Sequence, residues 1–584
     1  MTVAVIIATG RAGGRPGPAP TATLPWPGET PEPMTLLARL RAQLVTLKVS
    51  DHHVITRPDL APCLRKDGHE VIESADAAGD LREIAWLAER ADDTVVVLPG
   101  DLVTGDEPLA RLLLDAKGPA TALTIPAPKP AAAPPVAPAD APAAEPEGAA
   151  AAPTAAPTAA PAAAPTAAPT VVPGTAIRVE RGRIASAGSP YHRVTAPNAG
   201  FPGALRVARY RVAALSDVAQ RLALLLDDPE GPERLVPAEP EGEQSGQGGQ
   251  GEQSGGSERG GRAPEAIELL LVGLVREGVA VTGNGDPRLV SLRADGEEGA
   301  RAAAERIGAT DEDKIRLKAA VKSNDGFFTT FAVSTYSRYI ARWAARRGMT
   351  PNMVTSISMG IAVVAAVWFA AGSRTGMIVG GVLFYFSFVF DCVDGQLARY
   401  TRQFSTLGAW LDAVFDRAKE YTVFAGLAVG STAAAYDSSV YGGNVWGLAV
   451  AALALQTVRH MIDFSYGAGN RARAAKPLPT TPLDQPGDGA AAPAPAAAPQ
   501  AQQAPAPAPG GGSLVGRLSR RTSQVRVLHW AKKVIVLPIG ERFALIAITA
   551  ALFNAKVTFI ALLAWGVVAA LYTLTGRVMR SIAR

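Results

Sequence analysis

Cysteine is nearly absent from this sequence, in which only Cys63 and Cys392 occur among 584 residues. Two cysteines in distant regions provide neither a disulfide framework nor a zinc-binding spacing, and such scarcity is typical of a reducing, cytoplasmic compartment. Excess charge is also small, with a formal net charge of +4. Arginines beside apolar segments account for much of it, so the composition does not call for nucleic acid as a partner.

A positively charged start, as in a secretion signal, is also missing. The first ten residues read MTVAVIIATG, a short β-branched run that ends in glycine. We therefore expect a first β-strand here rather than a cleaved signal peptide.

Strand-like and helix-like patterns alternate over residues 1–125 and 173–236. The apolar runs that predict strands lie at 3–7, 94–98, 176–179 and 204–207, and the leucine-rich stripes that predict helices lie at 34–47, 109–114 and 212–226. This rhythm of βαβ units predicts an α/β domain built on a parallel sheet.

Low-complexity tracts interrupt the chain at 126–172, 237–262 and 475–512, where Ala and Pro, or Gly, Gln and Ser, dominate. Such compositions cannot bury a core, so we expect linkers or disordered insertions. Residues 263–326 regain an ordered pattern and are predicted to form a small separate segment.

Long apolar segments are confined to residues 349–584, which we predict to be an all-α transmembrane domain. Six spans are expected, at about 353–372, 376–398, 406–432, 442–462, 540–554 and 556–576. Residues 327–348 combine aromatic and basic side chains, a pattern typical of an amphipathic helix at the membrane interface. Basic residues gather on one side of a six-span arrangement, which predicts a multi-pass cell-membrane protein with both termini and the active site cytoplasmic.

Four carboxylates stand inside this apolar region. Asp391 and Asp394 are three positions apart, and Asp412 and Asp416 are four apart, so each pair shares one helix face. Two facing helices would bring all four together, and their negative charges would repel strongly without cations. Hard divalent ions such as Mg²⁺ or Mn²⁺ suit oxygen ligands, and two of them can clamp a pyrophosphate. The alternative is a pair of salt-bridged or solvated acidic helices.

The spacing D-x2-D-G-x2-A-R-x8-G-x3-D-x3-D resembles the signature of the CDP-alcohol phosphatidyltransferase family at every signature position. The resemblance implies that an alcohol attacks a CDP-linked donor and that CMP leaves. It also implies that Asp391, Asp394 and Asp412 hold two Mg²⁺ or Mn²⁺ ions. Asp416 would be a further metal ligand or the general base that deprotonates the acceptor.

The same resemblance implies a binding site for the CDP-linked donor. Gly395 and Gly408 would let nucleotide and helix backbone approach closely, and the guanidinium of Arg399 suits a phosphate. In the phosphatidylinositol phosphate synthase branch further positions hold the nucleotide; here they correspond to Asn352, Met353, Val354, Thr355 and Ser405. The alternative for residues 350–355 is a helix cap and first turn.

Arg417 and Arg542 are candidates for gripping the phosphate of an acceptor, with phosphorylated inositol as the first choice of acceptor. The alternative is that these arginines extend to the membrane interface. Lys419 and Glu420, which are neighbours in sequence, are expected to pair with each other.

The N-terminal region resembles a sugar-phosphate nucleotidyltransferase, through residues 24–28 and the sequence Val97-Leu98-Pro99-Gly100-Asp101, which is similar to that family's metal-binding strand end. Its glycine-rich loop departs from the family, and Thr23 stands where the family has a lysine. Without that cation a triphosphate is poorly neutralised. We therefore favour a non-catalytic α/β domain over an active cytidylyltransferase.

Together these patterns predict a membrane enzyme of phospholipid biosynthesis. Its partners would be a CDP-linked lipid or alcohol donor, a polar alcohol acceptor and membrane lipids, with no nucleic acid; a homodimer is left open. Two other hypotheses remain: a bifunctional cytidylyltransferase and transferase, and a membrane-anchored scaffold with a retired active site.

Overall fold

The computed structural model describes residues 2–11, 20–27, 34–127, 174–228, 264–322, 325–432, 444–472, 478–483 and 526–582. They divide into two compact units, Met1–Glu312 with Pro477–Ala496, and Asp313–Lys476 with Ala497–Arg584. The low-complexity tracts predicted at 126–172, 237–262 and 475–512 lie largely outside the described residues.

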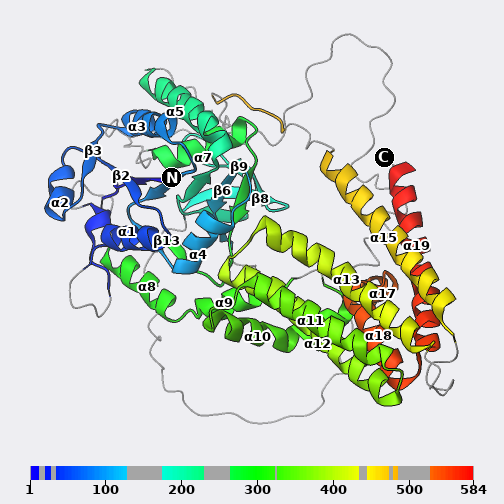
Figure 1. Ribbon diagram of the computed structural model, residues 1–584. Helices are drawn as coiled ribbons and strands as arrows, with labels where there is room; N and C mark the ends of the chain where they lie inside the picture. The colour runs from blue at the N-terminus through cyan, green and yellow to red at the C-terminus, as the bar shows by residue number, and fades with distance from the viewer. Residues whose placement is uncertain are drawn as a thin grey trace, which may run out of the picture. The chain divides into compact units, whose positions relative to one another are not determined.

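A mixed β-sheet forms the centre of the first unit (Figure 1). In spatial order its strands are β3 (Val71–Glu73), β2 (Asp51–Thr56), β1 (Val3–Ile7), β4 (Val95–Pro99), β11 (Leu205–Val207), β6 (Ala120–Leu123), β12 (Val281–Asn284), β9 (Arg183–Ala187), β8 (Thr175–Glu180), β10 (Ala199–Phe201) and β7 (Ile125–Pro126).

The predicted parallel sheet is correct for one half of this order and wrong for the other. Strands β1 to β4 are parallel, as the βαβ rhythm indicates, but β11 runs antiparallel to both β4 and β6. Strands β8 and β9 are also antiparallel, because the turn between them is tight: Arg181 and Gly182 have φ of 51° and 80°. Two successive residues with positive φ are what a two-residue hairpin requires.

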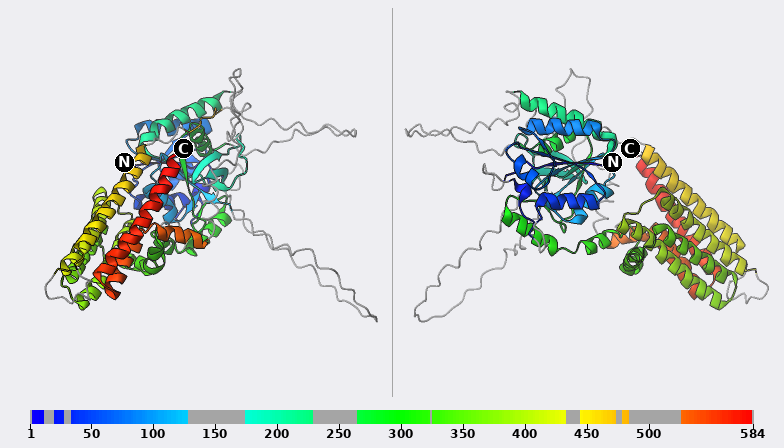
Figure 2. Two further views of the ribbon diagram at one scale, coloured as in Figure 1. Left: turned by 90° about the vertical axis from the view of Figure 1, so that its right-hand side faces the viewer. Right: turned by 60° about the vertical axis from the view of Figure 1, so that its left-hand side comes forward.

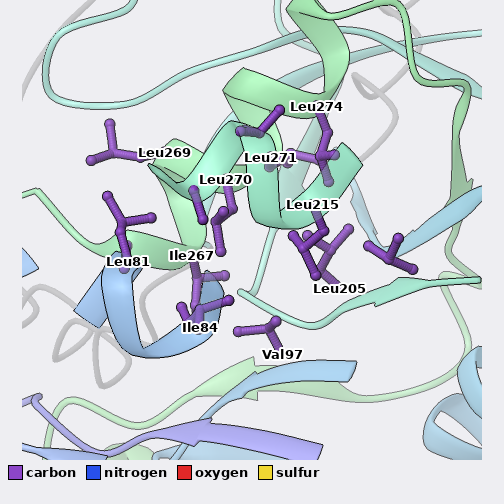
Figure 3. Close-up of a cluster of buried hydrophobic side chains, with 14 of the residues drawn as sticks. Leu81, Ile84, Val97, Leu205, Leu215, Ile267, Leu269, Leu270, Leu271 and Leu274 are labelled. Atoms are coloured by element: carbon purple, nitrogen blue, oxygen red, sulfur yellow. The ribbon is translucent and has the colours of Figure 1, made fainter. Parts of the chain in front are cut away.

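Helices cover both faces of the sheet. On one face α3 (Ala77–Arg90), α5 (Val212–Asp227) and α7 (Ala266–Arg276) pack against Val3, Val5 and Ile7 of β1. Figure 3 shows Ile84, Leu215 and Ile267 of these helices gathered with Val97 of β4. On the other face α1 (Leu36–Thr46) packs against the alternate side chains of β1, as the two-residue period of a strand requires. The result is a three-layer α/β domain.

Residues 264–312 contribute to this same domain, whereas the sequence indicates a separate segment at 263–326. Strand β12 pairs parallel to β6, and β13 (Ser291–Arg293) pairs antiparallel to β5 (Leu102–Thr104). Helix α7 is apolar around its whole circumference, so it has to be surrounded by other elements to be stable. Helix α8 (Glu297–Gly308) follows β13.

The second unit is helical. Its helices are α9 (Glu312–Ala319), a π-helical turn (Thr329–Val333), α10 (Ser334–Arg346), α11 (Pro351–Ala370), α12 (Arg374–Thr401), α13 (Thr406–Gly430), α15 (Trp446–Ala472), α17 (Arg526–Ile535), α18 (Ile539–Leu552) and α19 (Ala555–Ile582). Three segments of the described residues are long and apolar enough to cross a membrane: Pro351–Ala370, Arg374–Thr401 and Ala555–Met579.

Each of these helices also has large apolar side chains on its outer surface, besides those that it buries in the bundle. Val367 of α11 is 65% exposed, and Phe386 of α12 and Val568 of α19 are 45% and 54% exposed. Such surfaces are unfavourable in water and suit contact with lipid. The chain is therefore a membrane protein.

Local signals set the ends and neighbours of the helices. Thr350, Ser373 and Ser405 cap α11, α12 and α13 by accepting hydrogen bonds from backbone N–H groups of the first turn. Helices α15 and α19 lie side by side (Figure 2), and the absence of a side chain at Gly566 leaves room for Leu455. These contacts stabilise the arrangement from which the carboxylates project.

Candidate active site

Three of the four predicted carboxylates meet in space. Each of Asp391 and Asp394 on α12 and Asp412 on α13 offers a carboxylate oxygen, and these atoms all lie within 4.8 Å of one another. Asp394 is buried, Asp391 is half-buried and Asp412 is exposed, so the group runs from the protein interior to the surface. Oxygen atoms at this separation are suited to a shared hard cation.

The donor atoms fit a divalent cation. Among the described residues, Asp394 Oδ2 and Asp416 Oδ1 are buried without a hydrogen-bond partner. A buried carboxylate oxygen without a partner is costly, and a bound cation removes that cost. Asp416 lies one turn beyond Asp412 but is not one of the three grouped residues.

Lys419 completes this cluster, although the sequence did not identify it as a site residue. Its ammonium is fully buried, forms an ion pair with Asp391 and lies 4.0 Å from Asp416 Oδ1. The predicted pairing of Lys419 with Glu420 is wrong, because neighbouring residues on a helix point in different directions. The spacing of Lys419, three positions after Asp416, was the signal that could have found it.

Several predicted donor-binding residues gather at the start of α11 and α13. A Cβ at Gly408 would lie 2.7 Å from Asn352 Oδ1 and 2.8 Å from Ser405 Oγ, so a larger residue there would displace these two polar side chains. The Ser405 hydroxyl accepts a hydrogen bond of 2.8 Å from the Gly408 N–H. The Thr355 hydroxyl donates a hydrogen bond of 3.0 Å to the Pro351 carbonyl in the first turn of α11.

The remaining donor-binding candidates are placed differently. A Cβ at Gly395 would lie 3.3 Å from Arg399 Nη1, so this glycine leaves space for the guanidinium. Arg399 Nε donates to the backbone carbonyl of Ala320. Met353 is exposed and Val354 is buried in the hydrophobic core of the bundle, so the structure does not bring these two side chains into the group.

The two arginines predicted to bind acceptor phosphate lie in different surroundings. Arg542 is buried, and its Nε and Nη2 are 3.2 and 3.5 Å from the carboxylate oxygens of Glu420. Arg542 therefore does not extend to the membrane interface, which was the alternative considered from the sequence. Arg417 lies 4.7 Å from the ring centre of Phe464, and its buried Nε has no hydrogen-bond partner among the described residues.

Asp101 stands at the strand end that resembles a metal-binding one in the nucleotidyltransferases, and both of its carboxylate oxygens accept hydrogen bonds from protein groups. Arg293 Nε and Nη2 donate to its two oxygens at 2.9 and 3.0 Å, and Thr21 donates at 3.2 Å. Arg293 also pairs with Glu265. Burial lowers the pKa of Arg293, but the two carboxylates more than compensate and the net pKa is raised, so the guanidinium stays charged. The Arg293 guanidinium is thus the cation bound to the Asp101 carboxylate.

Comparison with known proteins bears on the helical unit. Residues 348–483 match the family model described as CDP-alcohol phosphatidyltransferase. This part of the chain is a CDP-alcohol phosphatidyltransferase domain. The match contains the whole carboxylate signature and the donor-binding candidates at residues 352–355.

Two relatives align with the CDP-alcohol phosphatidyltransferase domain. A phosphatidylinositol phosphate synthase from Mycolicibacterium smegmatis is 37% identical over 106 residues, which are 18% of this chain and 46% of that protein. An archaetidylinositol phosphate synthase from Pyrococcus horikoshii is 32% identical over 91 residues, 16% of this chain and 47% of that protein. The chain therefore spans about half the length of these curated relatives.

Among solved structures, the inositol-1-phosphate CTP transferase from T. maritima is 11% identical. The alignment covers 52% of this chain and 95% of that chain, with a TM-score of 0.30. A likeness of this size has no bearing on what the α/β domain binds or does.

Proposed function

We propose that the protein transfers a phosphatidyl or related phospho-alcohol group from a CDP-linked donor to a polar alcohol, with release of CMP. The observation that carries the proposal is the grouping of Asp391, Asp394 and Asp412 within 4.8 Å, inside the complete family signature. The transferred group would enter phospholipid biosynthesis.

Two divalent ions, Mg²⁺ or Mn²⁺, are the proposed cofactors, held by Asp391, Asp394 and Asp412, with Asp416 as either a further ligand or the general base. Bound there, they would neutralise the pyrophosphate of the donor and the charge that develops as CMP leaves. Asp416, whose Oδ1 lacks a hydrogen-bond partner among the described residues, would take the proton from the acceptor hydroxyl.

The donor nucleotide would bind beside Gly395 and Gly408, where a larger side chain would collide with neighbouring groups. Asn352, Thr355, Ser405 and Arg399 would supply polar contacts, and Met353 and Val354 would contribute backbone only. For the acceptor, the buried donor atom of Arg417 supports a phosphate contact. Arg542 would act by holding Glu420, and the proposed acceptor is phosphorylated inositol.

In the membrane we propose six spans, with α10 at the interface and both termini and the active site cytoplasmic. Helix α10 supports this, because it buries small side chains such as Ser337 and Ala341 while Tyr339 and Trp343 are more than half exposed. Cysteine-accessibility labelling of intact cells at Tyr339 and in the carboxy-terminal tail tests the orientation. Chromatographic mass in detergent tests a homodimer.

The central experiment is CMP release by the purified protein with Mg²⁺ and CDP-diacylglycerol. We expect release with one of four acceptors: inositol phosphate, glycerol phosphate, serine or inositol. No release with any of them would contradict the proposal. A scaffold function instead predicts that Asp416→Asn leaves the biological role of the protein intact.

For the α/β domain we propose a non-catalytic role, since Asp101 is paired with Arg293 and Thr23 replaces a lysine. The bifunctional alternative predicts pyrophosphate formation when the full-length protein meets CTP and polyol phosphates. Release of pyrophosphate above the level of an Asp101→Asn variant would establish that second activity.

A further inference from the structure

A short part of the low-complexity insertion between α15 and α17 is ordered against the α/β domain. Residues Leu478–Leu483, with the sequence LPTTPL, follow the end of α15 but belong to the first compact unit. Composition alone predicts disorder over 475–512. A segment that contradicts this prediction must be held by specific contacts.

Arg276, the last residue of α7, binds the segment through both its backbone and its side chain. Its carbonyl accepts a hydrogen bond of 2.8 Å from the Thr481 N–H. Its Nη1 donates to the carbonyl of Pro482 at 2.7 Å. Arg276 is only 5% exposed, so these are interior contacts rather than surface ones.

His192 provides a second buried contact. Its Nε2 lies 3.2 Å from the Leu483 carbonyl and its Nδ1 lies 2.7 Å from Ser189 Oγ. A carbonyl can only accept, so Nε2 must carry the proton, and the Ser189 hydroxyl then donates to Nδ1. His192 is 2% exposed, and both ring nitrogens are satisfied only while the segment is in place.

Apolar contacts and glycines complete the groove. Leu483 packs against the main hydrophobic core of the α/β domain, and a Cβ at Gly273 would lie 3.7 Å from its Cδ2. At Gly278, which has φ of 71°, a Cβ would lie 3.1 Å from the Leu478 carbonyl. The backbone of the segment therefore approaches the domain at a position that favours glycine.

We propose that Leu478–Leu483 is a docking peptide, and that the α/β domain is its receptor within the same chain. The groove formed by His192, Gly273, Arg276 and Gly278 recognises an extended peptide with two free carbonyls and a terminal leucine. The domain therefore has a binding function that requires neither a nucleotide nor a metal at Asp101.

Hydrogen exchange of the full-length protein in detergent, read by mass spectrometry over residues 476–484, tests the proposal. We expect the Thr481 amide to exchange at least about 100-fold more slowly than in a synthetic peptide of residues 476–484, since its N–H is bonded inside the domain. Exchange in the intact protein at the rate of the free peptide would overturn the proposal, and this measurement needs no variant.

Two variants sharpen the result. Leu483→Asp places a charge in the apolar part of the groove and should remove most of the Thr481 protection. Thr480→Ala, at an exposed position of the same peptide, is the matched control and should leave the protection unchanged. Full protection in Leu483→Asp would contradict the docking contacts. If Leu483→Asp loses both the Thr481 protection and a dimer, the peptide binds the α/β domain of a second copy. That result would overturn docking within one chain.

Discussion

The two units of this protein each contain buried aspartates, and they balance the charge to different degrees. In the α/β domain, Asp101 shares one guanidinium, that of Arg293, with Glu265. In the helical unit, Asp391, Asp394, Asp412 and Asp416 lie near one another, and among the described residues only Lys419 forms an ion pair with them. The first cluster has two carboxylates for one guanidinium. The second has four carboxylates for one ammonium, so its excess of negative charge is larger.

This difference separates a structural role from the proposed catalytic one. A carboxylate whose two oxygens both accept hydrogen bonds from a guanidinium already has a charge partner, so it gains less from an external cation. Carboxylates with unpartnered buried oxygens remain costly until a cation arrives. Sequence resemblance suggests a metal both at Asp101 and at the aspartates of the helical unit. The charge balance supports a metal only at the aspartates of the helical unit.

The largest effect should follow from changing the proposed base. Asp416→Asn should lower the rate of CMP release by roughly 10²–10⁴-fold, the scale of losing one proton-transfer group. Donor binding should survive, and raised Mg²⁺ should restore little. Asp412→Asn should also lose activity but recover part of it with Mg²⁺, since its loss weakens metal binding. Equal recovery of the two variants would show that Asp416 is a further ligand.

Breaking the Asp101–Arg293 ion pair should affect stability rather than chemistry. Arg293→Ala leaves the buried Asp101 carboxylate without its charge partner, which costs about 3–5 kcal/mol of folding free energy. We expect the α/β domain to unfold at a lower denaturant concentration. Hydrogen exchange of strand β4 at increasing denaturant measures this midpoint. Mg²⁺-dependent CMP release by the protein that remains folded should be unchanged.

Arg288→Ala is the control for that experiment. It breaks the ion pair of Arg288 with Asp286, but the Arg288 side chain is 50% exposed. Pairs of this kind contribute at most about 1 kcal/mol. A similar cost for both variants would show that the Asp101–Arg293 pair is not a special feature of the domain.

A pH titration sharpens the comparison further, because the docking groove of the α/β domain contains a buried histidine. Burial lowers the pKa of His192 to about 4, and the charge of Arg276 acts in the same direction. The unfolded pKa is near 6.5, so the folded domain binds fewer protons between these values. Its stability should be complete above about pH 6.5 and fall by up to about 3 kcal/mol as the pH approaches 4.

Urea unfolding at several pH values measures this effect. His192→Gln should flatten the dependence in that window, whereas His53→Gln, a change at a histidine on strand β2 that is 34% exposed, should not. If the stability of His192→Gln still falls as the pH decreases through this window, another titrating group causes the pH dependence.

The smallest effect concerns the counter-ion of the catalytic cluster. Lys419→Met removes the one ammonium that competes with a metal for Asp391, so Mn²⁺ should bind about 10-fold more tightly while the metal-free protein becomes less stable. Mn²⁺ titration by electron paramagnetic resonance and melting with and without metal measure both. Weaker Mn²⁺ binding would mean that Lys419 positions the ligands rather than competes for them. Lys556→Met, on the exposed start of α19, is the control.

Much of the local structure followed from short patterns. The β-branched run at residues 3–7 is β1, and the leucine stripe at 34–47 contains α1. Thr350 caps α11, as expected from one of the two interpretations of residues 350–355. These features depend on neighbours within one strand or one helical turn. The order of strands in the sheet depends on distant parts of the chain. Strand β12, for example, pairs with β6 although more than a hundred residues separate them in sequence.

By itself the sequence determined the residues of the proposed active site, because the aspartates, glycines and arginine of the signature lie within two consecutive helices and helical spacing fixes which of them share a face. Only the tertiary structure decided which charges are compensated. Lys419 with Asp391, Glu420 with Arg542, Arg293 with Asp101 and Leu483 with His192 are all contacts between different elements. Such contacts depend on how helices and strands pack, and no local spacing encodes that.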